Sequence, residues 1–178
     1  EIIIVDDCST DNSVKLISKL LSNIICLIKH DSNMGQSKSI LTGIQNAKYD
    51  VIVTLDGDGQ NNPADIMKLV KLFQEKKDFF LIGGIRMKRK DNFFKKSASK
   101  MANQIRNFFL RDNCQDTGCS LKVFDKNIFL SLPFFDGIHR FLPALFLGYN
   151  KKTFFVFERS ACKKACWKID CISEEESP

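Results

Sequence analysis

The sequence predicts an α/β fold with a mostly parallel central sheet flanked by helices. Short β-branched apolar runs alternate with segments of helical periodicity, which is the order that builds parallel sheets. Two of the predicted strands end in paired acids, and a third ends in a Gly-Gly turn. Because ligands of such folds bind where the carboxyl ends of the strands meet the loops, we expect the functional site at that edge.

The predicted elements follow one another along residues 1–157. The first run, IIIV followed by two aspartates, is typical of a buried parallel strand. A soluble domain seldom starts inside an element, so we expect that an earlier strand belongs to this domain and is absent from the sequence. Further strands are expected at 24–29, 51–55, 79–83, 119–124 and 153–157, with helices at 12–21, 36–47, 63–75, 93–110 and 137–147.

The bulk composition indicates one globular domain. The chain has 178 residues, of which 44% are apolar, and this is enough to bury a single core without cross-links. The formal charge of +6 fits a nucleic-acid binder, a membrane-surface protein or an enzyme for anionic substrates. No recognition motif for nucleic acid is evident, and acids at a sheet edge repel phosphates unless a metal intervenes, so we expect no nucleic-acid partner.

The cysteines favour a reducing compartment. Seven cysteines follow no paired framework, and an odd count in a chain able to form a core indicates free thiols. No apolar window reaches the length of a spanning helix, and no signal peptide opens the sequence. We therefore expect a cytoplasmic protein. Residues 158–178 form an atypical tail, first rich in Cys and Lys and then acidic, whose spacing of Cys162, Cys166 and Cys171 fits no trusted zinc pattern.

The paired acids predict a metal–diphosphate site. Asp6 and Asp7 end the first strand, and Asp56-Gly57-Asp58-Gly59-Gln60 follows the third. An Asp-x-Asp at a strand end places two hard oxygen donors on one tight turn, and glycines let a diphosphate approach. Aspartate and glycine are also common turn formers, but two such clusters at strand ends favour a Mg²⁺ or Mn²⁺ site.

Three runs, IIIVDDCSTD, HDSNMGQSKSILTGI and DVIVTLDGDGQNNPADI, closely resemble the nucleotide-sugar half of the inverting family-two glycosyltransferases, which adopt a GT-A fold. The resemblance covers residues 1–157 and implies that the domain takes its sugar from a nucleotide-sugar donor. It matches Asp6 and Asp7 to the acids that contact base and ribose, and Asn33 with Gly35 to the loop beside them.

The same resemblance matches Asp56 and Asp58 to the family's Asp-x-Asp. It implies that Asp58 is the direct metal ligand and that Gln60 lies near the same ion. A bound metal would neutralise the nucleoside diphosphate as it leaves.

The runs GGIRMKRKDNFFKK, DTGCSLKVF and GIHRFLPALFLGY look like the dolichyl-phosphate mannosyltransferase branch and its bacterial polyprenyl-phosphate relatives. The pattern matches Arg86, Asp116 and Ser120, whereas Lys122 stands where those relatives carry arginine. A lysine offers charge to a phosphate without the bidentate fork. The expected catalytic residues are Asp58, Arg86 and Asp116.

The first functional hypothesis is transfer of a hexose from GDP-mannose or a UDP-sugar to a polyprenyl phosphate at the cytosolic membrane surface, by metal-assisted inverting displacement. An ionised phosphate needs no general base. If the acceptor is a sugar hydroxyl instead, Asp116 is the expected base, and an inactive nucleotide-sugar-binding fragment is the third alternative. His139 and Arg140 either face the lipid phosphate or serve the fold. The basic, aromatic helix expected at 93–110 suits an anionic bilayer or a core stripe with a solvated face.

Overall fold

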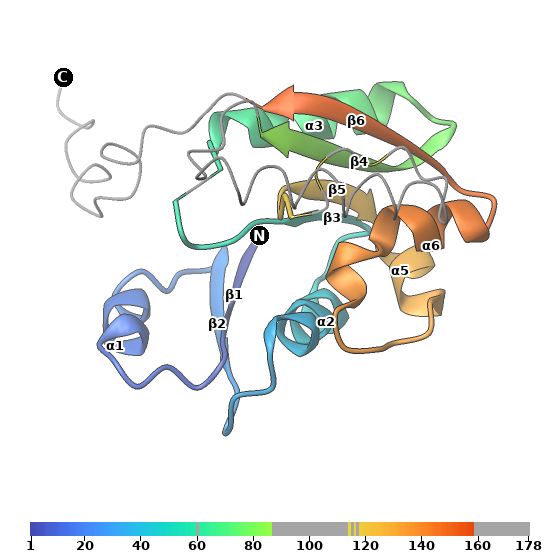
Figure 1. The fold of residues 1–178 in the computed structure, drawn as a ribbon. Helices are drawn as coiled ribbons and strands as arrows, with labels where there is room; N and C mark the ends of the chain where they lie inside the picture. Colours follow the sequence, from blue (N-terminus) through green and yellow to red (C-terminus); the bar gives the residue numbers. More distant parts are fainter. Residues whose placement is uncertain (60, 87–113, 115, 117, 159–178) are drawn as a thin grey trace, which may run out of the picture.

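A computed structural model of the chain describes residues 1–59, 61–86, 114, 116 and 118–158 (Figure 1). The expected helix at 93–110 and the tail from 159 onward lie outside the described residues. The strands are β1 (Ile2–Asp6), β2 (Ile25–Lys29), β3 (Val51–Thr54), β4 (Phe79–Arg86), β5 (Lys122–Asp125) and β6 (Lys152–Glu158). The helices are α1 (Ser13–Ser18), α2 (Gln36–Asn46), α3 (Ala64–Glu75), α5 (Lys126–Ser131), the short 3-10 helix η1 (Ile138–Arg140) and α6 (Leu142–Gly148).

The strands form a parallel pair, β1 with β2, and a four-stranded sheet in the order β3-β5-β4-β6. β6 runs parallel to β4, whereas β5 is antiparallel to both β3 and β4. The α/β fold is therefore confirmed, and β5 is the departure from parallel pairing within the described part of the chain. The apolar alternation of a strand is the same in either direction, so the sequence pattern did not reveal that β5 is reversed.

Two hydrophobic clusters cover the two faces of the four-stranded sheet. Leu81 and Phe124 face α2, α5 and α6, where the large core side chains are Phe129 and Phe146. The neighbouring strand residues Ile82 and Val123 point to the opposite face and pack against Leu69 of α3. Cys119 and Leu121 belong to the same cluster. Because side chains alternate between the two faces of a strand, the sheet is buried on both sides.

The region between Asp125 and Gly148 differs from the expected single helix. Asp125 caps α5, because its side-chain oxygen accepts a hydrogen bond from the backbone N–H of Ile128 at 3.0 Å. Further along, η1 is followed by α6, which has Pro143 in its first turn. Proline lacks an N–H and suits the start of a helix, so it marks a new helix and not the interior of a longer one.

A groove of about 790 Å³ lies between β1 and β3, with α2 along one side. Among the described strands, β1 pairs only with β2, and β3 only with β5. The earlier strand expected from the sequence stays a prediction. Within the described residues, no helix is long and apolar enough to cross a bilayer.

Candidate active site

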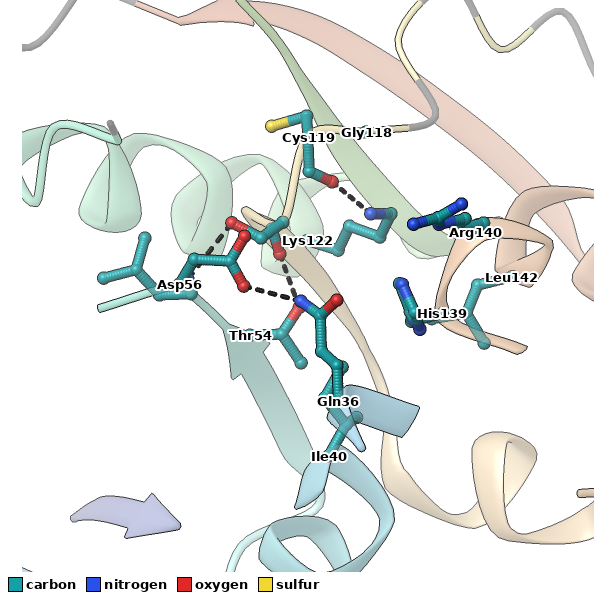
Figure 2. A pocket seen from close by; sticks show the side chains of 12 residues that line it. Gln36, Ile40, Thr54, Asp56, Gly118, Cys119, Lys122, His139, Arg140 and Leu142 are labelled. Carbon is teal, nitrogen blue, oxygen red and sulfur yellow. Dashed lines mark hydrogen bonds between the residues drawn. The ribbon is translucent and has the colours of Figure 1, made fainter. Parts of the chain in front are cut away.

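A cavity of about 260 Å³ opens at the carboxyl end of β3, beside the start of α2 (Figure 2). An acid from β3 stands on one wall, and cations from β5 and η1 stand on another. The lining residues are Gln36, Ile40, Thr54, Leu55, Asp56, Gly118, Cys119, Ser120, Lys122, His139, Arg140 and Leu142. Residues that lie more than a hundred positions apart in the sequence thus share one concave surface.

Asp56 is fixed in this cavity by neighbours from two other segments. Its Oδ1 accepts a hydrogen bond of 2.8 Å from Nε2 of Gln36, the first residue of α2. Its backbone N–H donates to Oγ of Ser120 at 3.1 Å, and that hydroxyl donates in turn to Oδ1 of Asn61 at 2.9 Å. Asn61 is 2% exposed, so this small network is anchored inside the protein. The Asp56 carboxylate is thereby held in one orientation at the cavity wall.

Asp58 follows Asp56 in the turn after β3 and is exposed to solvent. Gly59 adopts φ 73°, a conformation that favours glycine and lets the turn reverse tightly. Gln60, the third expected ligand, lies outside the described residues, and no group of three or more His, Cys, Asp or Glu residues in the described part is placed to hold a metal. Two carboxylates suit a hard cation such as Mg²⁺ that takes its other ligands from phosphate oxygens and water. The residues present therefore fit such an ion in the company of a diphosphate.

Lys122 places a cation inside the cavity. Its side chain is 4% exposed, and its Nζ donates a hydrogen bond to the backbone carbonyl of Cys119. Burial lowers the pKa of Lys122, while nearby Cys119, Cys114 and the carboxylates of Asp56 and Asp116 act in the opposite direction. A buried lysine with a perturbed pKa in a cleft is a common feature of functional sites.

His139 and Arg140 reach the same cavity from η1. The hydroxyl of Ser37, on α2, lies 2.9 Å from Nδ1 of His139 and accepts the backbone N–H of Gly137 at 2.8 Å. Burial lowers the pKa of His139, and the charges of Arg140 and Lys122 lower it further. The start of α2 thus contacts both walls, through Gln36 on the acidic side and Ser37 on the cationic side.

Asp7 accepts three hydrogen bonds at the end of β1. Its Oδ1 accepts from Nδ1 of His30 at 2.7 Å and from the N–H of Met34 at 2.8 Å, and its Oδ2 accepts from the N–H of Gly35 at 2.7 Å. Partial burial alone would raise the pKa of Asp7, but these hydrogen bonds hold it below its ordinary value. The carboxylate shapes the loop that leads into α2, and a direct contact with the nucleotide stays a prediction.

We expect the Asp7→Ala variant to loosen this loop. Removing an acceptor of three charge-assisted hydrogen bonds leaves the Met34 and Gly35 amides without their partner, at a cost of about 1.5 to 3 kcal/mol in the free energy of unfolding. Hydrogen exchange of those two amides should accelerate by more than that of the β4 amides, which follows only the change in global stability. Asp11→Ala is the matched control, because Asp11 is exposed and its carboxylate forms hydrogen bonds within its own segment, to Ser13 and to its own backbone. If the exchange of the Met34 and Gly35 amides is unaltered in Asp7→Ala, the Asp7 carboxylate does not stabilise this loop.

The structure brings some of the expected site residues together and separates others. Asp56, Ser120 and Lys122 line the cavity. Asp58 and Asp116 are not among its lining residues, and Asp116 is buried, at 6% exposed. A second group surrounds the end of β1: Asp6, which is 7% exposed and accepts the Ser9 amide, Asp7, Gly35 and the exposed Asn33. Arg86 ends β4, and its backbone alone is described.

Three residues of the site were missed by sequence reasoning: Gln36, Ser37 and Asn61. Gly35 adopts φ 83° directly before α2, and a glycine that precedes a helix at a strand-end edge is the signal that marks Gln36 and Ser37. Asn61 carries no comparable signal, because an asparagine before a proline-initiated helix is an ordinary turn residue.

An aspartate at one wall of the cavity, cations at the other and an α/β sheet whose edge carries the cavity are typical of a GT-A glycosyltransferase domain. The chain belongs to the glycosyl transferase family 2, whose family model matches residues 1–132.

Curated relatives agree with that assignment. An undecaprenyl-phosphate 4-deoxy-4-formamido-L-arabinose transferase of Yersinia pestis (strain Pestoides F) is 33% identical over 157 residues, which cover 86% of this chain and 47% of the relative. The enzyme of the same name from Serratia proteamaculans (strain 568) is 31% identical over 156 residues, with the same coverage. The chain therefore spans about half the length of the curated relatives it matches.

Solved structures share the fold at low sequence identity. The mannosyl-3-phosphoglycerate synthase of Rubrobacter xylanophilus has a TM-score of 0.68 at 14% identity. The match covers 97% of this chain and 58% of the synthase chain. The glucosyl-3-phosphoglycerate synthase of Mycobacterium tuberculosis, in complex with Mn²⁺, UDP-glucose and phosphoglyceric acid, has a TM-score of 0.63 at 14% identity, over 96% and 62% of the two chains. These similarities confirm the GT-A fold.

Proposed function

We propose that this chain is the catalytic domain of a transferase that moves a hexose from a nucleoside diphosphate to a polyprenyl phosphate with inversion. The observation that carries the proposal is the single cavity in which Asp56 faces Lys122, His139 and Arg140. One wall suits a metal-bound diphosphate, and the other suits an anionic acceptor. The names of the curated relatives, which act on undecaprenyl phosphate, support the choice of acceptor.

On the donor side, Gln36 and Ser120 orient Asp56, while Asp58 presents its carboxylate from the following turn. A Mg²⁺ or Mn²⁺ ion held by these two aspartates would neutralise the charge that develops on the departing diphosphate. The complex of the M. tuberculosis synthase with Mn²⁺ and UDP-glucose supports a divalent ion in this reaction and favours a UDP-sugar over GDP-mannose as the first donor to test.

On the acceptor side, Lys122 and Arg140 supply positive charge, and burial of Lys122 strengthens its attraction to an anion. A phosphate monoester is ionised at neutral pH and attacks an anomeric carbon without a base. Asp116, the base required by a hydroxyl acceptor, is 6% exposed and is not among the residues that line the cavity, although its charge acts on the pKa of Lys122. The geometry therefore favours the lipid phosphate, and we place the domain at the cytosolic face of the membrane that carries this lipid.

Transfer of labelled sugar tests the proposal. The chain is incubated with Mn²⁺, radiolabelled UDP-glucose or GDP-mannose, and either undecaprenyl phosphate in detergent or a soluble oligosaccharide. We expect label in the butanol-extractable lipid with one of the two donors and none in the oligosaccharide. Label in the oligosaccharide alone would replace the lipid phosphate by a hydroxyl acceptor. Nucleotide binding without any transfer would assign the chain to a nucleotide-sugar-binding role.

A further inference from the structure

The contact between Ser37 and His139 joins two segments that lie 102 positions apart in the sequence. Ser37 is the second residue of α2 and is 1% exposed, whereas His139 is half-buried in η1 and lines the cavity. Neither residue belongs to the acidic motifs. The donor site therefore does not explain why these two side chains are in contact.

The hydrogen bonds around Ser37 fix the direction of this contact. Its Oγ accepts the backbone N–H of Gly137 at 2.8 Å, and its own hydroxyl proton then needs an acceptor, because a buried donor is almost always satisfied. Within the described residues, Nδ1 of His139 at 2.9 Å is the acceptor available to that proton. Ser37 therefore donates, and Nδ1 of His139 carries a lone pair and no hydrogen.

An imidazole that accepts at Nδ1 carries its proton on Nε2. The lowered pKa of His139, caused first by burial and then by Arg140 and Lys122, keeps the ring uncharged at neutral pH. Figure 2 shows His139 with one ring nitrogen turned toward the side of the cavity where Lys122 and Arg140 lie. The remaining N–H thus joins two cations at the same wall, and this combination of donors suits an anionic oxygen.

We propose that Ser37 holds His139 as the Nε2–H tautomer, and that this N–H donates a hydrogen bond to a phosphoryl oxygen bound in the cavity. The inference rests on the proposed function and assigns His139 to substrate binding and Ser37 to positioning. It also means that His139 has no free lone pair with which to remove a proton. The oxygen belongs either to the acceptor phosphate or to the departing diphosphate, and both present the same chemistry to the ring.

Imidazole ¹⁵N spectra test the tautomer directly. The chain contains two histidines, His30 and His139, so the spectrum has two ring systems, and His139→Gln identifies one of them by its loss. We expect the His139 ring to show a protonated Nε2 and an unprotonated Nδ1, and the Ser37→Ala variant to show a mixture of tautomers. A protonated Nδ1 in the unmodified chain would overturn the proposal.

Binding of two phosphate probes tests the contact. Farnesyl monophosphate presents a lipid phosphate, and UDP with Mg²⁺, which is diamagnetic and leaves nearby signals sharp, presents a diphosphate. A shift of the His139 Nε2 signal with farnesyl monophosphate assigns the oxygen to the acceptor, and a shift with UDP alone assigns it to the leaving group. The absence of a shift with either probe, under conditions where calorimetry shows binding of both, overturns the proposal.

Affinity variants separate a contact from a role in folding. His139→Phe keeps a planar ring without a donor and should weaken the responding probe by about 10- to 100-fold, whereas His139→Gln supplies an amide donor and should recover most of that loss. Ser131→Ala is the control, because the Ser131 hydroxyl is exposed and binds Ile128 of its own helix. Equal affinity of the Phe variant and the unmodified chain contradicts the contact. If sugar is transferred to the lipid but the His139 signal responds to neither probe, this inference is wrong and the proposed reaction stands. If the His139 signal responds but no sugar is transferred, the proposed reaction is wrong and the contact stands.

Discussion

Replacing Asp58 by alanine is expected to abolish the metal dependence of nucleotide binding while leaving the fold intact. Asp58 is exposed in the turn after β3, so its removal creates no cavity in the core. As one of two carboxylates on this turn, it supplies a hard oxygen that a divalent cation prefers. Loss of a charged ligand should weaken nucleotide binding in Mn²⁺ by about 100-fold, toward the affinity measured without metal.

Calorimetry with UDP, UDP-glucose, GDP and GDP-mannose, each with and without Mn²⁺, measures this effect and shows which nucleotide base the site binds. Asp78→Ala is the matched control, because Asp78 is an exposed aspartate before β4 and away from the strand ends that form the site. The control should bind like the unmodified chain. If Asp58→Ala retains full metal-dependent affinity, Asp58 is not a ligand, and Asp56 with its Gln36 contact becomes the remaining candidate.

The sequence places Asp56 and Asp58 near each other but does not show the cavity as a whole, and the reason is physical. Asp56 and Asp58 follow a strand and are separated by Gly57 alone, so their proximity is a local property that spacing reveals. The cavity as a whole depends on tertiary packing, because β5 must lie beside β3 before Ser120 reaches the backbone of Asp56. No local pattern reveals that pairing or its antiparallel direction.

The same limit explains Asp7. A paired acid at a strand end favours a ligand contact, and the resemblance pointed to base and ribose. Three groups from 23 to 28 positions away donate hydrogen bonds to its carboxylate, and their approach depends on how the loop after β2 returns to the end of β1. Sequence spacing locates the acid but does not show which of its oxygens are already used.

The Lys122→Met variant is expected to lose acceptor binding without losing stability. Methionine has a similar length and no charge, so the variant removes the buried amine that the cavity presents to an anion. We expect farnesyl monophosphate to bind about 10- to 100-fold more weakly. The thermal midpoint should stay the same or rise, because relief from burying a cation offsets the hydrogen bond lost at the Cys119 carbonyl. Lys71→Met is the control, since the Lys71 side chain is 78% exposed on α3.

The pH dependence of stability gives Lys122 a second, independent readout. Burial lowers the pKa of Lys122 from the ordinary value of 10.5. Between the lowered pKa and 10.5, the unfolded chain binds a proton that the folded chain does not, so the free energy of unfolding gains a term that rises with pH. The Met variant lacks this term. Urea unfolding of both proteins at several values between pH 7 and 10 should therefore show the unmodified chain gaining stability relative to the variant as pH rises. Parallel profiles would mean that the amine keeps an ordinary pKa and is solvated, and an unperturbed, hydrated lysine would attract a phosphate far less than a buried one.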